Sequence, residues 1–137
     1  MLEAGRAAWP GVAIDPDVFE RFVAARAPDA DARTALHAGD VYLACACAAG
    51  DPAALAAFER AYLAKVGELL RGVRPSRELV DEVQQHLRER LFLGERPRIA
   101  DYSGRGTLAS WLRVAALRAA SNFRRSEGAR DRAEARA

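Results

Sequence analysis

Apolar residues recur every three or four positions along most of this chain, the spacing that places them on one face of an α-helix. No segment alternates apolar and polar residues as a half-buried strand does. Residues that favour a helix start divide the pattern: Asp15-Pro16, Asp51-Pro52, Ser76 and Thr107. The helices predicted from this pattern span residues 16–27, 40–49, 52–70, 76–93 and 107–125.

The segments between these helices have weaker patterns. The first dozen residues look like a loose lead-in, and residues 29–39 are ambiguous. Residues 94–106 form a loop that contains arginine and glycine, and a charged tail follows Arg125. We therefore expect an all-α fold, a compact bundle of about five helices.

Length and composition fit this expectation. A chain of 137 residues, half of them hydrophobic, can form one domain with its own core. Alanine, leucine and arginine dominate, and unbranched side chains favour helix over strand. No apolar run approaches 18 residues, and Met1–Arg6 does not resemble a secretory signal. We expect a soluble, cytoplasmic protein that does not bind membranes.

Charge is distributed unevenly along the chain. Residues 1–95 carry eleven basic and fifteen acidic side chains, a net charge of −4. Residues 96–137 carry ten arginines and four acidic side chains, a net charge of +6. The near-neutral total therefore hides a basic C-terminal third, which indicates a polyanionic partner.

The sequence offers no candidate catalytic or metal-binding site. Cys45 and Cys47 would point roughly 200° apart on a helix, so we interpret them as small buried residues. His37 and His86 are distant in sequence, and no ligand spacing typical of zinc is present. Neither a Walker loop, an HExxH motif nor a Ser–His–Asp order occurs. We expect no cofactor and no enzymatic activity.

The predicted helix over residues 76–93 has two different faces. One face carries leucine and valine, and the other is polar and mostly acidic. The polar residues are Glu78, Asp81, Glu82, Gln85 and Glu89. Two interpretations remain open: a solvated face, or a docking surface for a basic or polar partner helix.

The last predicted helix is the most informative segment. A helical wheel predicts a buried stripe of Leu108, Leu112, Ala115, Ala119, Asn122 and Phe123, with Trp111 at its flank. The opposite face carries Arg113, Leu117, Ala120 and Arg124, and the strip beside it carries Val114, Arg118, Ser121 and Arg125. No acidic residue occurs between Tyr102 and Ser126, whereas solvated helices usually mix charges. This pattern is typical of nucleic-acid binding.

Three segments resemble region two of bacterial RNA polymerase sigma factors, in the extracytoplasmic-function branch of the sigma-70 family. Tyr102–Ala115 resembles the family's loop and helix, with Val114-Ala115 in place of Ile-Ala and Arg124-Arg125 as the closing pair. Glu78–Val83 resembles the Asp-Leu-Val-Gln-Glu-Val segment, and Gly50–Phe58 resembles the Gly-Asp-x-x-Ala helix start. These motifs occur in the family's order and cover about residues 40–125.

The sequence also departs from the family pattern. Leu117 and Ser121 stand where the family often has Asn and Asp. Residues 1–39 match nothing in the general family, and such an extension would suit a myxobacterial-type subfamily. The charged C-terminal residues resemble the start of a linker to a second DNA-binding domain. The expected organisation is an extension with a short helix (1–39), a region-two domain (40–127) and the start of a linker (128–137).

The resemblance implies partners and a mechanism. Region two binds the clamp helices of the largest subunit of core RNA polymerase, and it melts the minus-ten promoter element by capturing unstacked bases of the non-template strand. The expected polymerase-binding residues are Glu78, Asp81, Glu82, Gln85 and Glu89. The expected DNA-binding residues are Arg96, Arg98, Tyr102, Ser103, Arg105, Arg113, Leu117, Ala120 and Arg124. For Trp111 we favour core packing over base stacking. An anti-sigma factor would be a further partner.

Two other interpretations compete with this one. The first is a helical protein-interaction module, a degenerate sigma-like domain that binds polymerase or a regulator without promoter recognition. The departures at Leu117 and Ser121 motivate it. The second is a small enzyme, for which the sequence offers no constellation of catalytic residues.

Overall fold

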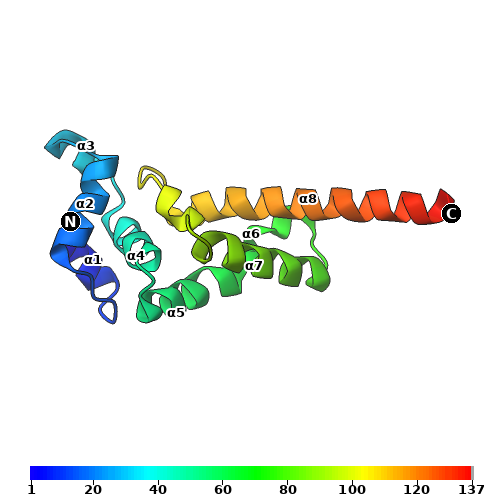
Figure 1. Ribbon diagram of the computed structural model, residues 1–137, viewed down its shortest axis with the longest axis horizontal. Helices are drawn as coiled ribbons and strands as arrows, with labels where there is room; N and C mark the ends of the chain where they lie inside the picture. The colour runs from blue at the N-terminus through cyan, green and yellow to red at the C-terminus, as the bar shows by residue number, and fades with distance from the viewer. Residues whose placement is uncertain (137) are drawn as a thin grey trace.

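A computed structural model describes residues 1–136 and contains only helices and loops over that range (Figure 1). The all-α fold class is confirmed, but eight α-helices are present where about five were expected. The α-helices are α1 (Leu2–Ala8), α2 (Pro16–Arg26), α3 (Ala30–Thr34), α4 (Ala38–Ala48), α5 (Pro52–Ala61), α6 (Val66–Leu69), α7 (Arg77–Phe92) and α8 (Leu108–Arg136). The short 3-10 helices are η1 (Leu63–Lys65), η2 (Arg71–Val73) and η3 (Arg98–Asp101).

The predicted helix starts are confirmed at four positions. The side chains of Asp15 and Asp51 accept backbone hydrogen bonds at 2.8 and 2.9 Å at the starts of α2 and α5. The hydroxyl groups of Ser76 and Thr107 accept backbone hydrogen bonds at 3.1 Å at the starts of α7 and α8. Each cap satisfies a backbone donor that the first turn of a helix leaves without a partner.

Helix α4 forms the centre of the fold. Seven consecutive residues, Val41 to Cys47, are buried, and α1, α2, α5 and η3 all contact this helix. A helix that is buried on every side is apolar on every side. The expected burial of Cys45 and Cys47 is confirmed, and this burial raises the pKa of their thiols to about 11 and about 12.

The expectation of a loose N-terminal lead-in is wrong, because α1 packs closely against α4. A Cβ atom at Gly5 would lie 2.3 Å from the Tyr42 ring, so only glycine permits this approach. The Trp9 indole N–H donates to the carbonyl of Gly39 at 3.0 Å, and the Tyr42 hydroxyl donates to the carbonyl of Val12 at 2.6 Å. Residues 1–39 therefore share one hydrophobic core with the rest of the chain.

The single helix expected over residues 52–70 is divided into α5, η1 and α6. The break lies at Tyr62, whose backbone dihedrals (φ −126°, ψ −58°) are not helical. At the break, the Gln84 side-chain amide on α7 donates to the carbonyl of Leu63 at 2.9 Å. The bend buries Leu63 and Leu70 in the core. Tertiary packing against α7 thus overrides a pattern that is helical in sequence.

Helix α8 continues to Arg136 instead of ending near Arg125, and Figure 1 shows it projecting beyond the bundle. Residues 128–137 were expected to begin a linker; residues 128–136 are helical, and residue 137 lies outside the described residues. Their alternating charges fit a helix that is solvated on all sides. No helix in residues 1–136 is both long and apolar enough to cross a membrane.

Candidate functional site

The acidic face of α7 (Glu78, Asp81, Glu82, Gln85 and Glu89) is exposed along its length. The opposite side of the helix buries Leu79, Val83, Leu87 and Leu91. The Gln85 side-chain amide donates to the Glu89 carboxylate at 3.0 Å, while Arg88 points elsewhere and pairs with Glu59 at 2.5 Å. The structure therefore brings all five predicted residues onto one negatively charged surface.

The buried stripe of α8 is rotated relative to the expected one. Leu108, Leu112 and Ala119 are buried as expected, but Ala116 and Ala120 are buried as well, and Asn122 is exposed. Helix α6 contacts α8, and the small alanine side chains permit its close approach. The outward orientation expected for Ala120 is therefore wrong: its side chain is only 2% exposed.

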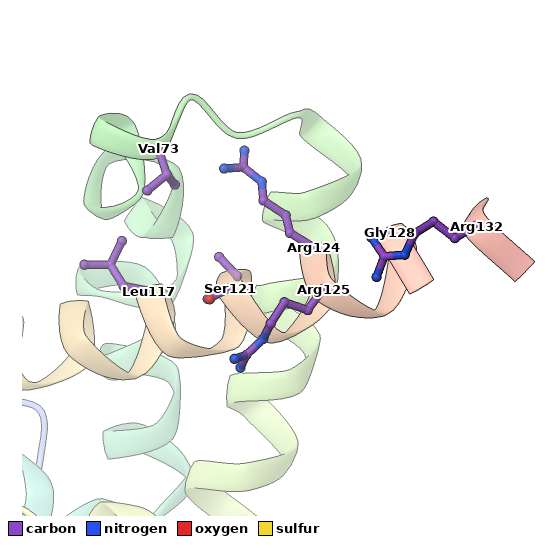
Figure 2. Close-up of a pocket in the computed structure, with 8 residues that line it drawn as sticks. Val73, Leu117, Ser121, Arg124, Arg125, Gly128 and Arg132 are labelled. Carbon is purple, nitrogen blue, oxygen red and sulfur yellow. The ribbon is translucent and has the colours of Figure 1, made fainter. Parts of the chain in front are cut away.

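A groove of about 540 Å³ runs between η2 and the middle of α8. We call it the basic groove; it is lined by Val73, Leu117, Ala120, Ser121, Arg124, Arg125, Gly128 and Arg132. Figure 2 shows Val73 and Leu117 at one end of the groove, while the arginines come from the α8 turns that follow. Arg124 donates to the carbonyl of Arg74 at 3.2 Å, which holds it beside η2. The groove combines an apolar end with arginines and has no acidic lining residue.

The arginines of α8 that precede Glu127 are exposed and form no ion pair within residues 1–136. These residues are Arg113, Arg118, Arg124 and Arg125. The ion pairs of the described chain lie elsewhere: Arg33 with Glu20, Arg88 with Glu59, and Arg98 with Asp101. Four unneutralised guanidinium groups on one helix produce a positive potential that attracts polyanions.

A second hollow, of about 370 Å³, lies between α7 and α8. Its polar and aromatic lining comprises His86, Arg90, Arg98, Trp111, Arg118 and Asn122. Trp111 is half-buried and its ring meets the Tyr102 ring edge-on, with the centroids 5.9 Å apart. The contact with Tyr102 fits the favoured core role of Trp111. The exposed part of the same side chain lines the hollow, so the core role is only part of its placement. Sequence reasoning missed Arg90 and Asn122, since only the packing of α7 on α8 brings them together.

The loop between η3 and α8 is folded down onto α4. Tyr102 is 1% exposed, and its hydroxyl donates to the carbonyl of Gly106 at 2.5 Å. Burial raises the pKa of Tyr102. Gly104 has a positive φ of 82°, and a Cβ atom there would lie 2.6 Å from Val41. The expectation that the Tyr102 side chain binds DNA is therefore wrong, because it is buried.

The predicted DNA-binding residues do not form a single site. Arg96 and Arg98 lie near the end of α7, and Ser103 and Arg105 border a hollow beside α2. Leu117 and Arg124 line the basic groove, with Leu117 half-buried. Arg113 is exposed on α8 outside these hollows. The exposed members therefore lie in separate places: near the end of α7, beside α2, in the basic groove, and on α8 outside the hollows.

Within residues 1–136, no three His, Cys, Asp or Glu side chains gather as a metal site would require. The His86 ring packs edge-on against Phe123 at 5.7 Å, and His37 precedes the first residue of α4. Comparison of the chain with protein-family models, with curated proteins and with solved structures finds no match.

Proposed function

We propose that this chain is a region-two domain of a sigma factor, which binds core RNA polymerase and recognises and melts the minus-ten promoter element. The observation that carries the proposal is the acid-free arginine surface of α8, whose four guanidinium groups have no ion-pair partner in residues 1–136. The order of the three sequence segments that resemble the family adds to it.

The DNA-binding part of the proposal rests on the basic groove and on the second hollow, between α7 and α8. Arginines bind phosphates and release counterions, so binding should weaken as salt rises. Extruding a base costs a few kcal/mol, and stacking on an aromatic or guanidinium plane can return about 1–3 kcal/mol. Because Tyr102 is buried, the exposed part of Trp111 and the arginine planes are the available stacking groups.

The polymerase-binding part of the proposal rests on the acidic face of α7. All five of its side chains are exposed. Arg88, on the same helix, forms its ion pair with Glu59 and so does not neutralise this face. A negative surface attracts a basic or polar partner and orients its approach. In this proposal the partner is the pair of clamp helices of the polymerase largest subunit.

A direct test measures binding of labelled single-stranded oligonucleotides by fluorescence anisotropy, with and without core polymerase. The probe is a pool of single-stranded oligonucleotides of random sequence. We expect the Arg113→Ala/Arg124→Ala double variant to weaken binding at least about tenfold and to reduce the salt slope by about 1.4, since each single-strand phosphate contact contributes about 0.7. The control is Arg6→Ala/Arg21→Ala, which removes the same charge from exposed sites on α1 and α2. Absence of binding to wild type with polymerase present would contradict the proposal.

One observation favours a second candidate, a module that binds polymerase or a regulator without recognising a promoter. Burial removes the Tyr102 side chain from the expected DNA surface and leaves Ala120 only 2% exposed at the wall of the basic groove. Capture of core polymerase by the domain, together with no opening of promoter DNA by that complex, would favour this candidate. Promoter opening that depends on Arg113 and Arg124 would exclude it.

A further inference from the structure

Arg26, at the C-terminal end of α2, reaches across to a loop more than seventy residues away in sequence. Its Nε donates to the carbonyl of Tyr102 at 2.7 Å, and its Nη2 donates to the carbonyl of Ala100. Its Nη1 donates to the carbonyl of Phe22 at 2.9 Å. One guanidinium group therefore ties the end of α2 to two carbonyls around the end of η3.

The surroundings of Arg26 hold it in this position. Its guanidinium carbon lies 3.3 Å from the centroid of the Phe22 ring. The side chain is half-buried, and this burial lowers its pKa. Three carbonyl acceptors compensate the desolvated cation, and the planar fork of arginine can serve several acceptors at once where lysine cannot.

Other residues near Arg26 in sequence hold the rest of the loop. The backbone N–H of His37 donates to the carbonyl of Gly104 at 2.8 Å. One carboxylate oxygen of Asp40 accepts from the backbone N–H of Leu108 at 2.9 Å, at the first turn of α8. Residues 26–40 thus contact the loop at its start, its middle and its end.

The same contacts shape the exposed side of the loop. A hollow of about 380 Å³ is lined jointly by α2 and the loop. Its lining residues are Ala25, Arg26, Ala100, Asp101, Tyr102, Ser103 and Arg105. Ser103 and Arg105 are exposed there, so the backbone that Arg26 holds determines where these two side chains lie.

We propose that Arg26 is a positioning residue for DNA binding, through which the N-terminal helices hold the loop of residues 98–107 in its binding conformation. This inference rests on the proposed function. A loop that is already ordered does not have to be immobilised when the DNA strand binds, so preorganisation increases affinity. The N-terminal segment thereby becomes part of the DNA-binding apparatus through the loop that it holds.

The test compares Arg26→Gln and Arg26→Lys with Arg21→Gln, an exposed control on the same helix. Amide hydrogen exchange reports the order of residues 98–107, and oligonucleotide anisotropy with core polymerase reports DNA affinity. We expect both Arg26 variants to speed exchange in the loop and to weaken DNA binding about three- to tenfold. Affinity for core polymerase without DNA should stay unchanged, which a general loss of folding would not allow.

The lysine variant separates positioning from charge. If Arg26 acted only through its positive charge, Arg26→Lys would bind DNA as wild type does, and the inference would be overturned. Faster exchange in the loop with unchanged DNA affinity would also overturn it, while the proposed function would stand. Failure of the wild type itself to bind DNA would overturn the proposed function, and the inference with it.

Discussion

Helices α4 and α8 differ in how much of their surface the rest of the fold covers. Helix α4 is buried at seven consecutive positions and is contacted by four other elements, α1, α2, α5 and η3. Helix α8 buries one stripe near its start and projects beyond the bundle with its arginines exposed (Figure 1). The difference separates two tasks: α4 holds the fold together, and α8 presents the surface that the proposed function uses.

The largest expected effect is on stability, from truncation in α4. Leu43→Ala should lower the free energy of unfolding by about 2–5 kcal/mol, because it leaves a cavity at a fully buried site. Val114→Ala on α8, where the side chain is 48% exposed, should change it by less than about 0.5 kcal/mol. Urea denaturation followed by circular dichroism measures both. Equal losses at the two sites would contradict the division of tasks.

A second prediction concerns the side of α8 that packs against α6. Ala120→Leu should destabilise the fold by about 1–3 kcal/mol, because Ala120 is only 2% exposed and a longer side chain has to displace the neighbours that bury it. Ser121→Leu, at the next position but exposed, is the matched control and should change stability by less than about 0.5 kcal/mol. If Ala120→Leu left the thermal unfolding temperature unchanged, this result would contradict the burial of Ala120.

A third prediction is that the acidic face of α7 and the arginines of α8 bind different partners. Asp81→Lys/Glu82→Lys should weaken binding to core polymerase about tenfold, because it reverses charge at the middle of the acidic face. The same variant should keep or increase its affinity for single-stranded DNA. Glu3→Lys/Glu68→Lys changes the same charge at exposed positions elsewhere and should leave polymerase binding unaltered. Both affinities can be measured by anisotropy with labelled domain or labelled oligonucleotide.

The remaining expected effect, confined to high pH, is the pH dependence that α4 contributes. Burial raises the pKa of Cys45 from 9.0 to about 11 and that of Cys47 from 9.0 to about 12. The folded state therefore keeps both protons where the unfolded state loses them, so stability is fully present below pH 9 and falls as pH rises above it. Each thiol should contribute a slope of up to about 1.4 kcal/mol per pH unit between pH 9 and 10.

Urea titrations at several pH values check this slope, and Cys45→Ala/Cys47→Ala should flatten it. The native thiols should also react slowly with an aromatic disulfide reagent, since burial keeps them protonated and inaccessible. Rapid reaction at pH 8 without unfolding would show that α4 opens more readily than its burial indicates.

Several features of this fold followed from residue type and spacing alone. Asp15, Asp51, Ser76 and Thr107 all cap the helices that they were expected to begin. Capping depends on a local hydrogen bond, so it can be predicted from a few neighbouring residues. The exposure of the acidic face of α7 followed from helical periodicity. The burial of Cys45 and Cys47 followed from residue type, because free cysteine is usually buried.

Other features required contacts that local patterns do not encode. The order of α1 depends on Gly5 fitting against Tyr42, and the break at Tyr62 depends on packing against α7. The wheel for α8 placed Ala120 outside by its angle from Leu108. Alanine is equally compatible with a buried and an exposed site, so the residue type did not correct that placement. Only the approach of α6 and η2 decides which side of that helix is covered.

The sequence by itself determined an all-helical chain, an acidic helix face and a basic C-terminal third, because helix periodicity and charge are local properties. The tertiary structure alone decided which of the predicted DNA residues are accessible. It buried Tyr102 and Ala120, opened the basic groove beside Arg124, and set Arg26 against the carbonyls of a distant loop. These are outcomes of long-range packing, in which the fit between segments far apart in the chain determines what remains exposed.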